Sequence, residues 1–325
     1  MTKVCITGGA GFIGSHLGKK ILELGHELVV IDNFHPYYST CRKQYQLQQI
    51  KNVGFFHFYN VDILQFDVLK TIFFHHRPNV VFHLAALPGV QPSLSEPLAY
   101  IDYDVKATVN ILQVAGEAGV QHVLFASSSS VYGNQAFQPL KEEMANGQVI
   151  SPYAAAKYSA ESFCHAYAHI YGYTMTIFRY FTVYGPWGRP DMAISKFIRQ
   201  LLRDEPITVY GDHTARDYTY IDDIVAGMIQ ALERKGESDI FNLGAGQPVT
   251  MKQLLAELRT HFPHMRVHYE PPRLGDVVAT WADITKAKEK IGYEPRISLR
   301  EGLAKTIEWA KQYENETNKN FDATH

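Results

Sequence analysis

Residues 3–17 read KVCITGGAGFIGSHL, and the order of apolar residues and glycines in them is the strongest structural signal of the chain. KVCIT is a short apolar run typical of a buried strand, and glycines follow it at positions 8, 9, 11 and 14, immediately before a helical pattern. Glycines at such a turn let the backbone bend tightly and approach a pyrophosphate, while the helix N-terminus supplies N–H donors. The stretch therefore predicts a strand, a phosphate-binding turn and a helix in succession.

An acidic residue, Asp32, ends the next apolar run, ELVVID, eighteen residues beyond Gly14. A carboxylate there accepts hydrogen bonds from the adenosine ribose hydroxyls and repels a 2′-phosphate, so NAD is favoured over NADP. Asp62 closes a third run, FYNVDIL, and two interpretations of it stay open. It caps the adenine end of the cofactor, or it is a solvated turn residue at a strand end.

Further apolar runs alternate with amphipathic stretches along the first half of the chain: VGFFHFYNVD, NVVFHLA, HVLFASSS and TMTIFRY. This alternation predicts an α/β fold with a doubly wound parallel sheet of the Rossmann type. One helix is expected over residues 98–119. Another is expected over 151–172, with Ser151 as N-cap, Pro152 as first helical residue and Gly172 as terminator.

We expect two domains. Residues 1–180, with a return segment near 217–245, form the NAD-binding domain, and residues 181–325 form mainly a smaller C-terminal α/β lobe that binds substrate. Ligands of such folds bind outside the carboxyl ends of the strands.

Composition excludes several classes of protein. The 325 residues are 46% hydrophobic and 20% charged with a net charge of -2, which gives no electrostatic case for nucleic acid or an anionic membrane as partner. The N-terminus does not read as a signal peptide, and no apolar run approaches the length of a membrane span. Three scattered cysteines, Cys5, Cys41 and Cys164, are expected to be small buried hydrophobic residues of a reducing compartment, the cytoplasm. We expect no metal site.

Tyr153 and Lys157 lie four residues apart in YAAAK and therefore on one face of the expected helix. An ammonium beside a phenol lowers the pKa of the phenol, so Tyr153 could act as a base near neutral pH. Such a pair is more often simply exposed. Upstream, FASSSSVYG places four serines at a strand end, where they make a turn or bring one hydroxyl to Tyr153.

Together TGGAGFIG, Asp32, HLAA, SSSSVYG, YAAAK and RDYTYIDDI resemble the extended short-chain dehydrogenases/reductases, specifically their NAD-dependent nucleotide-sugar epimerase/dehydratase family. The resemblance implies a bound NAD, a UDP- or dTDP-sugar substrate and a homodimer formed by helices 98–118 and 153–171. It implies Tyr153 as base, Lys157 as the residue that tunes it, and Ser128 as the third catalytic residue. It implies cofactor contacts from Gly8, Gly11, Phe12, Ile13, Gly14, Asp32, Asn33, Asp62, Ile63, Leu84, Ala85 and Ala86, besides Tyr153 and Lys157. It implies substrate contacts from Ser93, Ser128, Ser129, Ser130, Thr182, Arg189, Arg216, Arg273 and Asp276, with the two arginines Arg216 and Arg273 holding the diphosphate.

Within this family the chain is most similar to enzymes that epimerise C4 through a 4-keto intermediate. Dehydratases carry an Asp-Glu pair where this chain has Ser129 and Ser130, and decarboxylases of UDP-glucuronate carry a Glu in place of Ser130. Without such carboxylates there is no obvious acid to expel a hydroxyl. A non-catalytic NAD-binding protein is the alternative outside enzymes, and retention of Tyr153, Lys157 and Ser128 disfavours it.

The stretch RYFTVYGPWGRPDM, residues 179–192, holds more aromatic and arginine residues than a turn needs, and its glycines and prolines argue against a helix or strand. It is similar to the loop of UDP-glucuronate 4-epimerases, whereas epimerases of neutral UDP-sugars tend to have Asn in place of Thr182. We therefore expect interconversion of UDP-glucuronate and UDP-galacturonate, with UDP-glucose or UDP-N-acetylglucosamine as alternative substrates. Two residues depart from the family pattern: Asp104 replaces an Asn, and Gln91 stands where glucuronate epimerases often have Arg.

Overall fold

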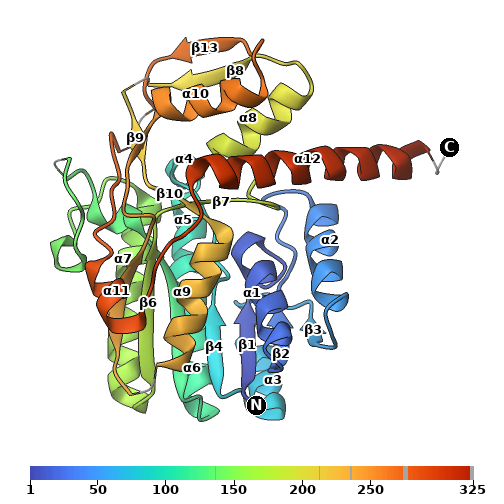
Figure 1. Cartoon of the computed structure of the whole chain (residues 1–325). Coiled ribbons are helices and arrows are strands. Elements are labelled where there is room, and N and C mark those ends of the chain that lie inside the picture. The colour runs from blue at the N-terminus through green and yellow to red at the C-terminus, as the bar shows by residue number, and fades with distance from the viewer. Residues whose placement is uncertain (136, 212, 235, 274–276, 323–325) are drawn as a thin grey trace.

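A seven-stranded parallel sheet forms the centre of the molecule (Figure 1). The computed structural model describes residues 1–135, 137–211, 213–234, 236–273 and 277–322, with side chains described as far as Tyr313. The strand order is β11-β6-β5-β4-β1-β2-β3. The strands are β1 (Lys3–Thr7), β2 (Glu27–Ile31), β3 (His57–Tyr59), β4 (Val80–His83), β5 (His122–Ser128), β6 (Thr174–Tyr180) and β11 (Asp239–Leu243). The predicted α/β fold with a Rossmann-type sheet is confirmed.

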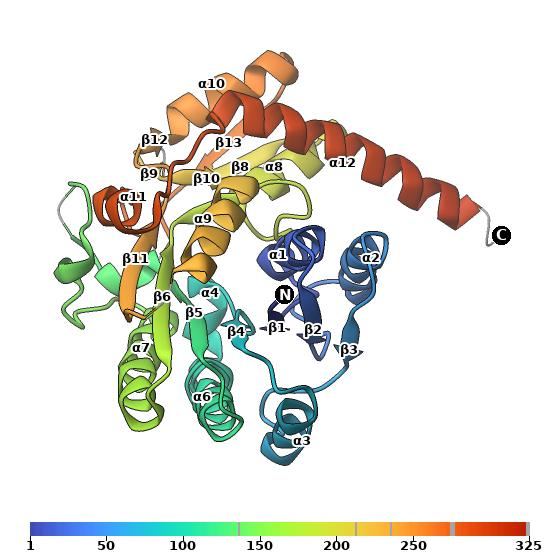
Figure 2. The same ribbon diagram turned by 60° about the horizontal axis from the view of Figure 1, so that its bottom comes forward.

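Helices cover both faces of this sheet, as Figure 2 shows. On one face lie α1 (Phe12–Glu23), α2 (Thr40–Lys51) and α9 (Ile221–Glu233), and on the other α3 (Phe66–His76), α6 (Ala107–Glu117) and α7 (Pro152–Tyr171). Because side chains alternate along a strand, β1 sends Val4 and Ile6 into one core and Cys5 into the other. Both cores bury predominantly apolar side chains, which is why the strands read as continuous apolar runs.

The strand order reverses between β1 and β4. From β1 the chain proceeds through β2 to β3 on one side, and β4 begins the other half of the sheet on the opposite side. The carboxyl ends of β1 and β4 therefore border the crevice where doubly wound sheets bind ligands. Gly8 follows β1 at this point and Leu84 follows β4.

The two expected helices differ in their outcome. Helix α7 begins and ends as predicted: the Ser151 hydroxyl accepts the Ala154 N–H, Pro152 is the first helical residue, and Gly172 ends the helix at φ +74°. The helix expected over 98–119 is instead three pieces, α5 (Pro97–Tyr100), a π-helical turn η1 (Ile101–Lys106) and α6. It follows a short helix α4 (Val90–Ser95).

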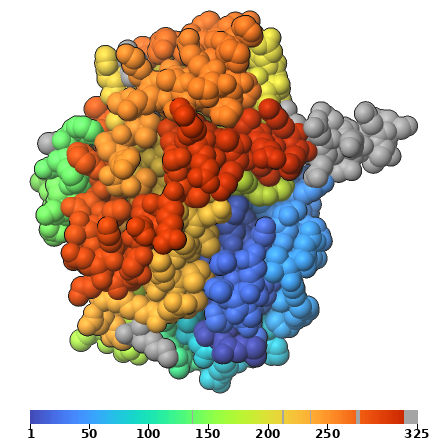
Figure 3. All heavy atoms as spheres, in the orientation of Figure 1, coloured from blue at the N-terminus to red at the C-terminus, as the bar shows by residue number. Residues whose placement is uncertain are grey.

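A smaller lobe lies beyond the carboxyl ends of the sheet strands (Figure 1). Its elements are β7 (Thr182–Tyr184), α8 (Ala193–Leu202), β8 (Ile207–Tyr210), β9 (Ala215–Arg216), β10 (Tyr218–Tyr220), β12 (Val249–Thr250), α10 (Met251–His261) and β13 (Val267–Glu270). Helix α12 (Leu299–Asp322) contacts α8 and β10, and Figure 3 shows it across the face between this lobe and the sheet. Short helices η2 (Ser129–Tyr132), η3 (Glu142–Met144) and α11 (Thr285–Ile291) complete the described elements. The domain boundary at residue 180 stays a prediction.

Two local predictions are wrong. Residues 182–184 of the turn-rich stretch form β7, because Thr182, Val183 and Tyr184 pair in parallel with β10, a partner the local pattern cannot show. Cys41 is exposed on α2, whereas Cys5 and Cys164 are buried as predicted, and all three are free thiols. In the described part of the chain, no helix is both long and apolar enough to span a membrane.

Candidate active site

One large cavity lies at the carboxyl ends of β1, β4 and β5, between the sheet and the smaller lobe. Its volume is about 690 Å³. Twenty of the predicted site residues line it: Gly8, Gly11, Phe12, Ile13, Gly14, Asp32, Asn33, Ile63, Leu84, Ala85, Ala86, Ser128, Ser129, Ser130, Tyr153, Lys157, Thr182, Arg189, Arg216 and Arg273. Residues scattered over most of the sequence thus meet around one space.

Two predicted site residues among those described, Asp62 and Ser93, do not line the cavity. Asp62 lies beside it, where its carboxylate accepts hydrogen bonds from the Asn33 side chain at 2.8 Å and the Tyr103 hydroxyl at 3.1 Å. Ser93 is fully buried and its hydroxyl donates to the Val90 carbonyl at 2.6 Å. Asp276 lies outside the described residues. The roles expected for these three stay predictions.

The glycine-rich turn leaves its backbone open to the cavity. Gly8 has φ +75°, and a Cβ there would lie 2.7 Å from the Ala85 nitrogen, while a Cβ at Gly14 would lie 2.3 Å from the Gly8 carbonyl oxygen. Helix α1 starts at Phe12 with Gly11 as a cap that has no side chain. The N-terminal turn of α1 can therefore meet a pyrophosphate directly.

Asp32 is held rigidly at the end of β2. Its carboxylate accepts the Ala10 N–H at 3.0 Å and the Phe34 N–H at 2.8 Å. Burial raises the pKa of this carboxyl, while Lys43 and the two N–H groups oppose the shift. The turn, the helix terminus and a carboxylate that lines the same cavity fit a dinucleotide with free ribose hydroxyls.

The expected catalytic residues come from two neighbouring elements. Tyr153 and Lys157 lie in the first two turns of α7, and Ser128 ends β5. The Ser128 hydroxyl accepts the Ser130 N–H at 3.1 Å, so it caps η2 and is fixed in place. Lys157 is almost completely buried, with its Nζ 5.3 Å from the centre of the Phe125 ring.

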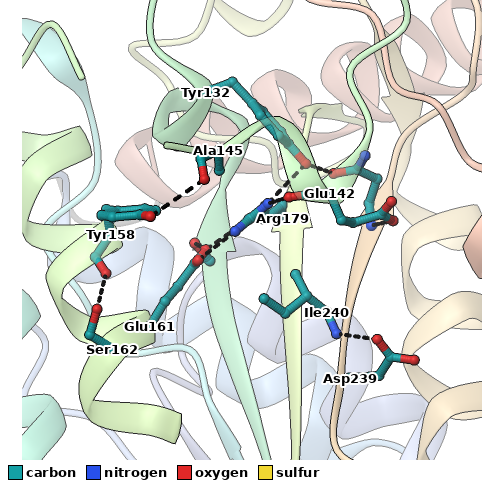
Figure 4. Close-up of polar contacts among 11 residues, drawn as sticks. Tyr132, Glu142, Ala145, Tyr158, Glu161, Ser162, Arg179, Asp239 and Ile240 are labelled. Atoms are coloured by element: carbon teal, nitrogen blue, oxygen red, sulfur yellow. Dashed lines mark hydrogen bonds and ion pairs between the residues drawn. The ribbon is translucent and has the colours of Figure 1, made fainter. Parts of the chain in front are cut away.

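A buried polar network behind these residues connects α7 with β5 and β6 (Figure 4). Arg179 on β6 binds Glu161 on α7 through two hydrogen bonds, Nε to Oε1 at 2.9 Å and Nη2 to Oε2 at 2.7 Å. The Ser127 hydroxyl donates to the same carboxylate, and Arg179 also donates to the Tyr132 hydroxyl at 3.2 Å. Because Ser127 precedes Ser128 and Glu161 lies one turn beyond Lys157, the network fixes the end of β5 against α7. Glu161 was not among the predicted site residues, although it continues the four-residue spacing of Tyr153 and Lys157.

The residues expected to bind substrate include Thr182, Arg216 and Arg273, which line the cavity. Thr182 sits at the start of β7, and its N–H donates to the Asp217 carbonyl at 2.9 Å. The Arg273 guanidinium stacks 3.6 Å from the centre of the Tyr210 ring. Arg216 donates to the carbonyls of Ala215 and Val278 at 2.9 and 3.1 Å.

Arg189 is paired within its own loop. It donates to both carboxylate oxygens of Asp191, and the Tyr37 hydroxyl donates to Asp191 at 3.2 Å. Gly89 packs against both partners: a Cβ there would lie 2.9 Å from the Tyr37 hydroxyl and 3.3 Å from Arg189 Nη2. Sequence analysis did not identify Asp191 as a site residue.

A parallel sheet with a glycine-rich turn at its switch point, and a tyrosine–lysine pair beside the same cavity, define a class of dinucleotide-dependent enzymes. Within the described residues, no cluster of three or more His, Cys, Asp or Glu side chains could hold a metal ion. The model of the NAD dependent epimerase/dehydratase family matches residues 4–244, and the chain belongs to this family.

Similar proteins include epimerases of both acidic and neutral UDP-sugars. The chain is 41% identical over 310 residues to a UDP-glucuronate 4-epimerase of Thermodesulfobacterium geofontis, covering 94% of this chain and 95% of the relative. A structure of the UDP-glucuronic acid 4-epimerase of Bacillus cereus with UDP-glucuronic acid and NAD superposes with a TM-score of 0.90 at 34% identity, over 96% of this chain and 99% of that one. The UDP-glucose 4-epimerase of Thermotoga maritima, solved with UDP-glucose, gives 0.87 at 35% identity, over 95% and 99%. Overall likeness therefore does not decide which sugar is bound.

Proposed function

We propose that this enzyme epimerises a UDP-sugar at C4 with bound NAD, and that it interconverts UDP-glucuronate and UDP-galacturonate. The observation that carries the choice of sugar is the group of hydroxyls around the cavity. Ser129, Ser130 and Thr182 line it together with Tyr153, and Arg189 is already neutralised by Asp191. A uronate carboxylate would thus meet neutral donors rather than an unpaired cation.

In this mechanism Tyr153 removes the proton from the C4 hydroxyl, and the buried Lys157 ammonium stabilises the phenolate. Ser128 passes the proton between the sugar oxygen and Tyr153. Bound NAD would supply the acceptor for the C4 hydride and the source of the hydride for its return to the opposite face, so no net oxidation of the sugar would occur. The glycine-rich turn would hold the pyrophosphate of NAD and Asp32 its adenosine ribose, while Arg216 and Arg273 would hold the diphosphate of the substrate.

Neutral hydroxyl donors suit a sugar that must turn over between two hydride transfers. An unpaired arginine would bind the carboxylate in one pose by a bidentate contact, and this would oppose rotation. Hydroxyls of Thr182 and the serines can exchange partners as the ring rotates. The second candidate is a 4-epimerase of neutral UDP-hexoses, which the likeness to the Thermotoga maritima UDP-glucose 4-epimerase supports.

The test is to incubate the purified protein, without added NAD, with UDP-glucuronate, UDP-glucose and UDP-N-acetylglucosamine and to identify the products. We expect UDP-galacturonate as the main product, formed by retained NAD. Faster turnover of a neutral hexose would overturn the choice of sugar, and no turnover with or without added NAD would overturn the activity itself.

We further propose that the enzyme is a homodimer in the cytoplasm. Apolar side chains are exposed on the helices expected to pair: Leu98 on α5, Ile101 on η1, and Phe163 and Ile170 on α7. Exposed apolar side chains gathered on one face indicate a protein interface. Sedimentation should give a dimer for the unmodified protein and a monomer for Phe163→Asp with Ile170→Asp, whereas Phe55→Asp, an exposed apolar residue away from these helices, should stay dimeric. A monomer at the outset would contradict the proposal.

A further inference from the structure

Asp104 lies in the middle of the π-helical turn η1 that interrupts the expected helix. It is fully buried, although a carboxylate is among the side chains that avoid burial most strongly. Single π-turns inside α-helices are rare and often occur at functional sites. This chain has Asp at a position where the family pattern has Asn, so the buried negative charge is a difference of this chain from that pattern.

The contacts of Asp104 point to the catalytic lysine. One carboxylate oxygen, Oδ1, accepts the Leu87 N–H at 2.7 Å, which ties η1 to the loop after β4. The other, Oδ2, lies 3.8 Å from Lys157 Nζ and has no hydrogen-bond partner in the described part of the chain. Both side chains are buried. The carboxylate of Asp104 on η1 thus faces the Lys157 ammonium on α7 at 3.8 Å.

Other titratable groups around Lys157 are neutral or already paired. Burial lowers the pKa of His83 on β4 to about 3, so this imidazole is uncharged. Burial also raises the pKa of Cys164 on α7 and of Tyr100 on α5 above their ordinary values, so both stay protonated. Glu161 is bound by Arg179, and Arg189, which faces Tyr153 from the smaller lobe, is bound by Asp191. Among these groups, Asp104 is the anion that acts on Lys157.

We propose that Asp104 is a positioning residue that holds Lys157 and sets the pH range in which Tyr153 serves as the base. Its negative charge opposes the effect of the Lys157 ammonium, and so keeps the phenol more basic than a neutral amide at this position would. This role rests on the proposed function of Tyr153. In this proposal the basicity of Tyr153 depends on two buried charges, the ammonium of Lys157 and the carboxylate of Asp104.

The proton state of Asp104 is itself close to the working range. Burial raises the pKa of its carboxyl to about 6, although Lys157 and the Leu87 N–H oppose the shift. Above that pH the carboxylate is charged and opposes ionisation of Tyr153; below it the group is neutral.

The decisive variant is Asp104→Asn, which keeps an oxygen to accept the Leu87 N–H and replaces the charged oxygen that faces Lys157 by a neutral NH2 group. Tyrosines are labelled with ¹³C at Cζ, and the Tyr153 signal is assigned as the one lost in Tyr153→Phe. We expect the titration midpoint of Tyr153 to fall by on the order of one pH unit in Asp104→Asn, because the Lys157 ammonium then acts without an opposing charge. The acid limb of kcat/KM should move in the same direction. Asp102→Asn, on the exposed side of the same turn and paired with Lys106, should change neither.

An unchanged midpoint of Tyr153 in a folded Asp104→Asn protein would overturn the proposal, even if turnover fell. If Asp104→Asn did not fold, the NMR titration of the unmodified protein would still test the proposal. The chemical shift of Tyr153 should then change in two steps, the smaller one at the pH where Asp104 titrates. A single step would refute the coupling between Asp104 and Tyr153. The NMR titration needs no substrate, so it stands apart from failure of the proposed activity, which the substrate panel tests.

Discussion

Arg189 binds Asp191, two residues further along its own loop, through Nε to Oδ1 at 3.1 Å and Nη2 to Oδ2 at 2.5 Å. Burial raises the pKa of the Asp191 carboxyl, but the Arg189 guanidinium outweighs this effect and holds that pKa below its usual range. The carboxylate therefore stays charged at neutral pH. The positive charge of Arg189, which lines the cavity, is therefore compensated by a carboxylate of the same loop. Because Arg189 is already paired, we expect this loop to accommodate a carboxylate of the substrate without binding it in one fixed pose.

Asp191→Asn should release Arg189 toward the substrate. For UDP-glucuronate we expect both KM and kcat to fall, each by about fivefold to tenfold, since a hydrogen bond to a charged group contributes about 1.5–3 kcal/mol and only part of it is new. Steady-state kinetics with UDP-glucuronate and UDP-glucose measures this, because the neutral sugar should be little affected. A rise in KM for both sugars would mean that Asp191 only supports the loop.

Thr182→Asn should shift the preference from the acidic toward the neutral sugar. If Thr182 faces the carboxylate as proposed, the longer amide would take up space there and replace the hydroxyl, so we expect the ratio of kcat/KM for UDP-glucuronate over UDP-glucose to fall roughly tenfold to hundredfold. Competition between the two sugars in one reaction gives this ratio directly. Thr260→Asn, at an exposed position of α10, is the matched control. An unchanged ratio would remove the argument for a uronate.

Tyr153→Phe should lower kcat by about 10² to 10⁴, the usual contribution of a positioned base, while leaving the fold intact. Tyr158→Phe is the control from the same helix, since its hydroxyl donates only a long bond to the Ala145 carbonyl at 3.4 Å. Turnover and thermal unfolding of both variants separate catalysis from stability. Comparable activity of the two variants would exclude Tyr153 as the base.

The parts of the fold and of the site that could be predicted are those determined by residues close together in the sequence. The glycine-rich turn, Asp32 and the capped helix α7 each have their determining residues within one short stretch, and the structure has these elements where they were expected. The expected site residues came together because parallel strands bring their carboxyl ends to one edge.

The features that could not be predicted depend on residues distant in sequence. Trp187 in the turn-rich stretch packs on Trp309 of α12, and the Arg42 guanidinium of α2 lies 5.5 and 5.2 Å from the centres of these two rings. Trp187, one of the aromatic residues that a turn does not need, thus fastens the loop to α2 and α12. Likewise β7 needs β10 as its partner, and the π-turn around Asp104 needs Leu87 and Lys157.

Glu161→Ala should destabilise the protein because it leaves Arg179 without its carboxylate partner. Arg179 would keep its charge in a buried position, and breaking a buried pair on one side costs about 3–5 kcal/mol. Urea unfolding measures the loss, and Glu23→Ala, which removes an exposed pair with Lys20, should change the free energy of unfolding by less than about 1 kcal/mol. Because Ser127 also loses its acceptor, Glu161→Gln should retain more stability and more activity than Glu161→Ala. Equal losses in Glu161→Ala and Glu23→Ala would show that this network does not hold α7 against β5 and β6.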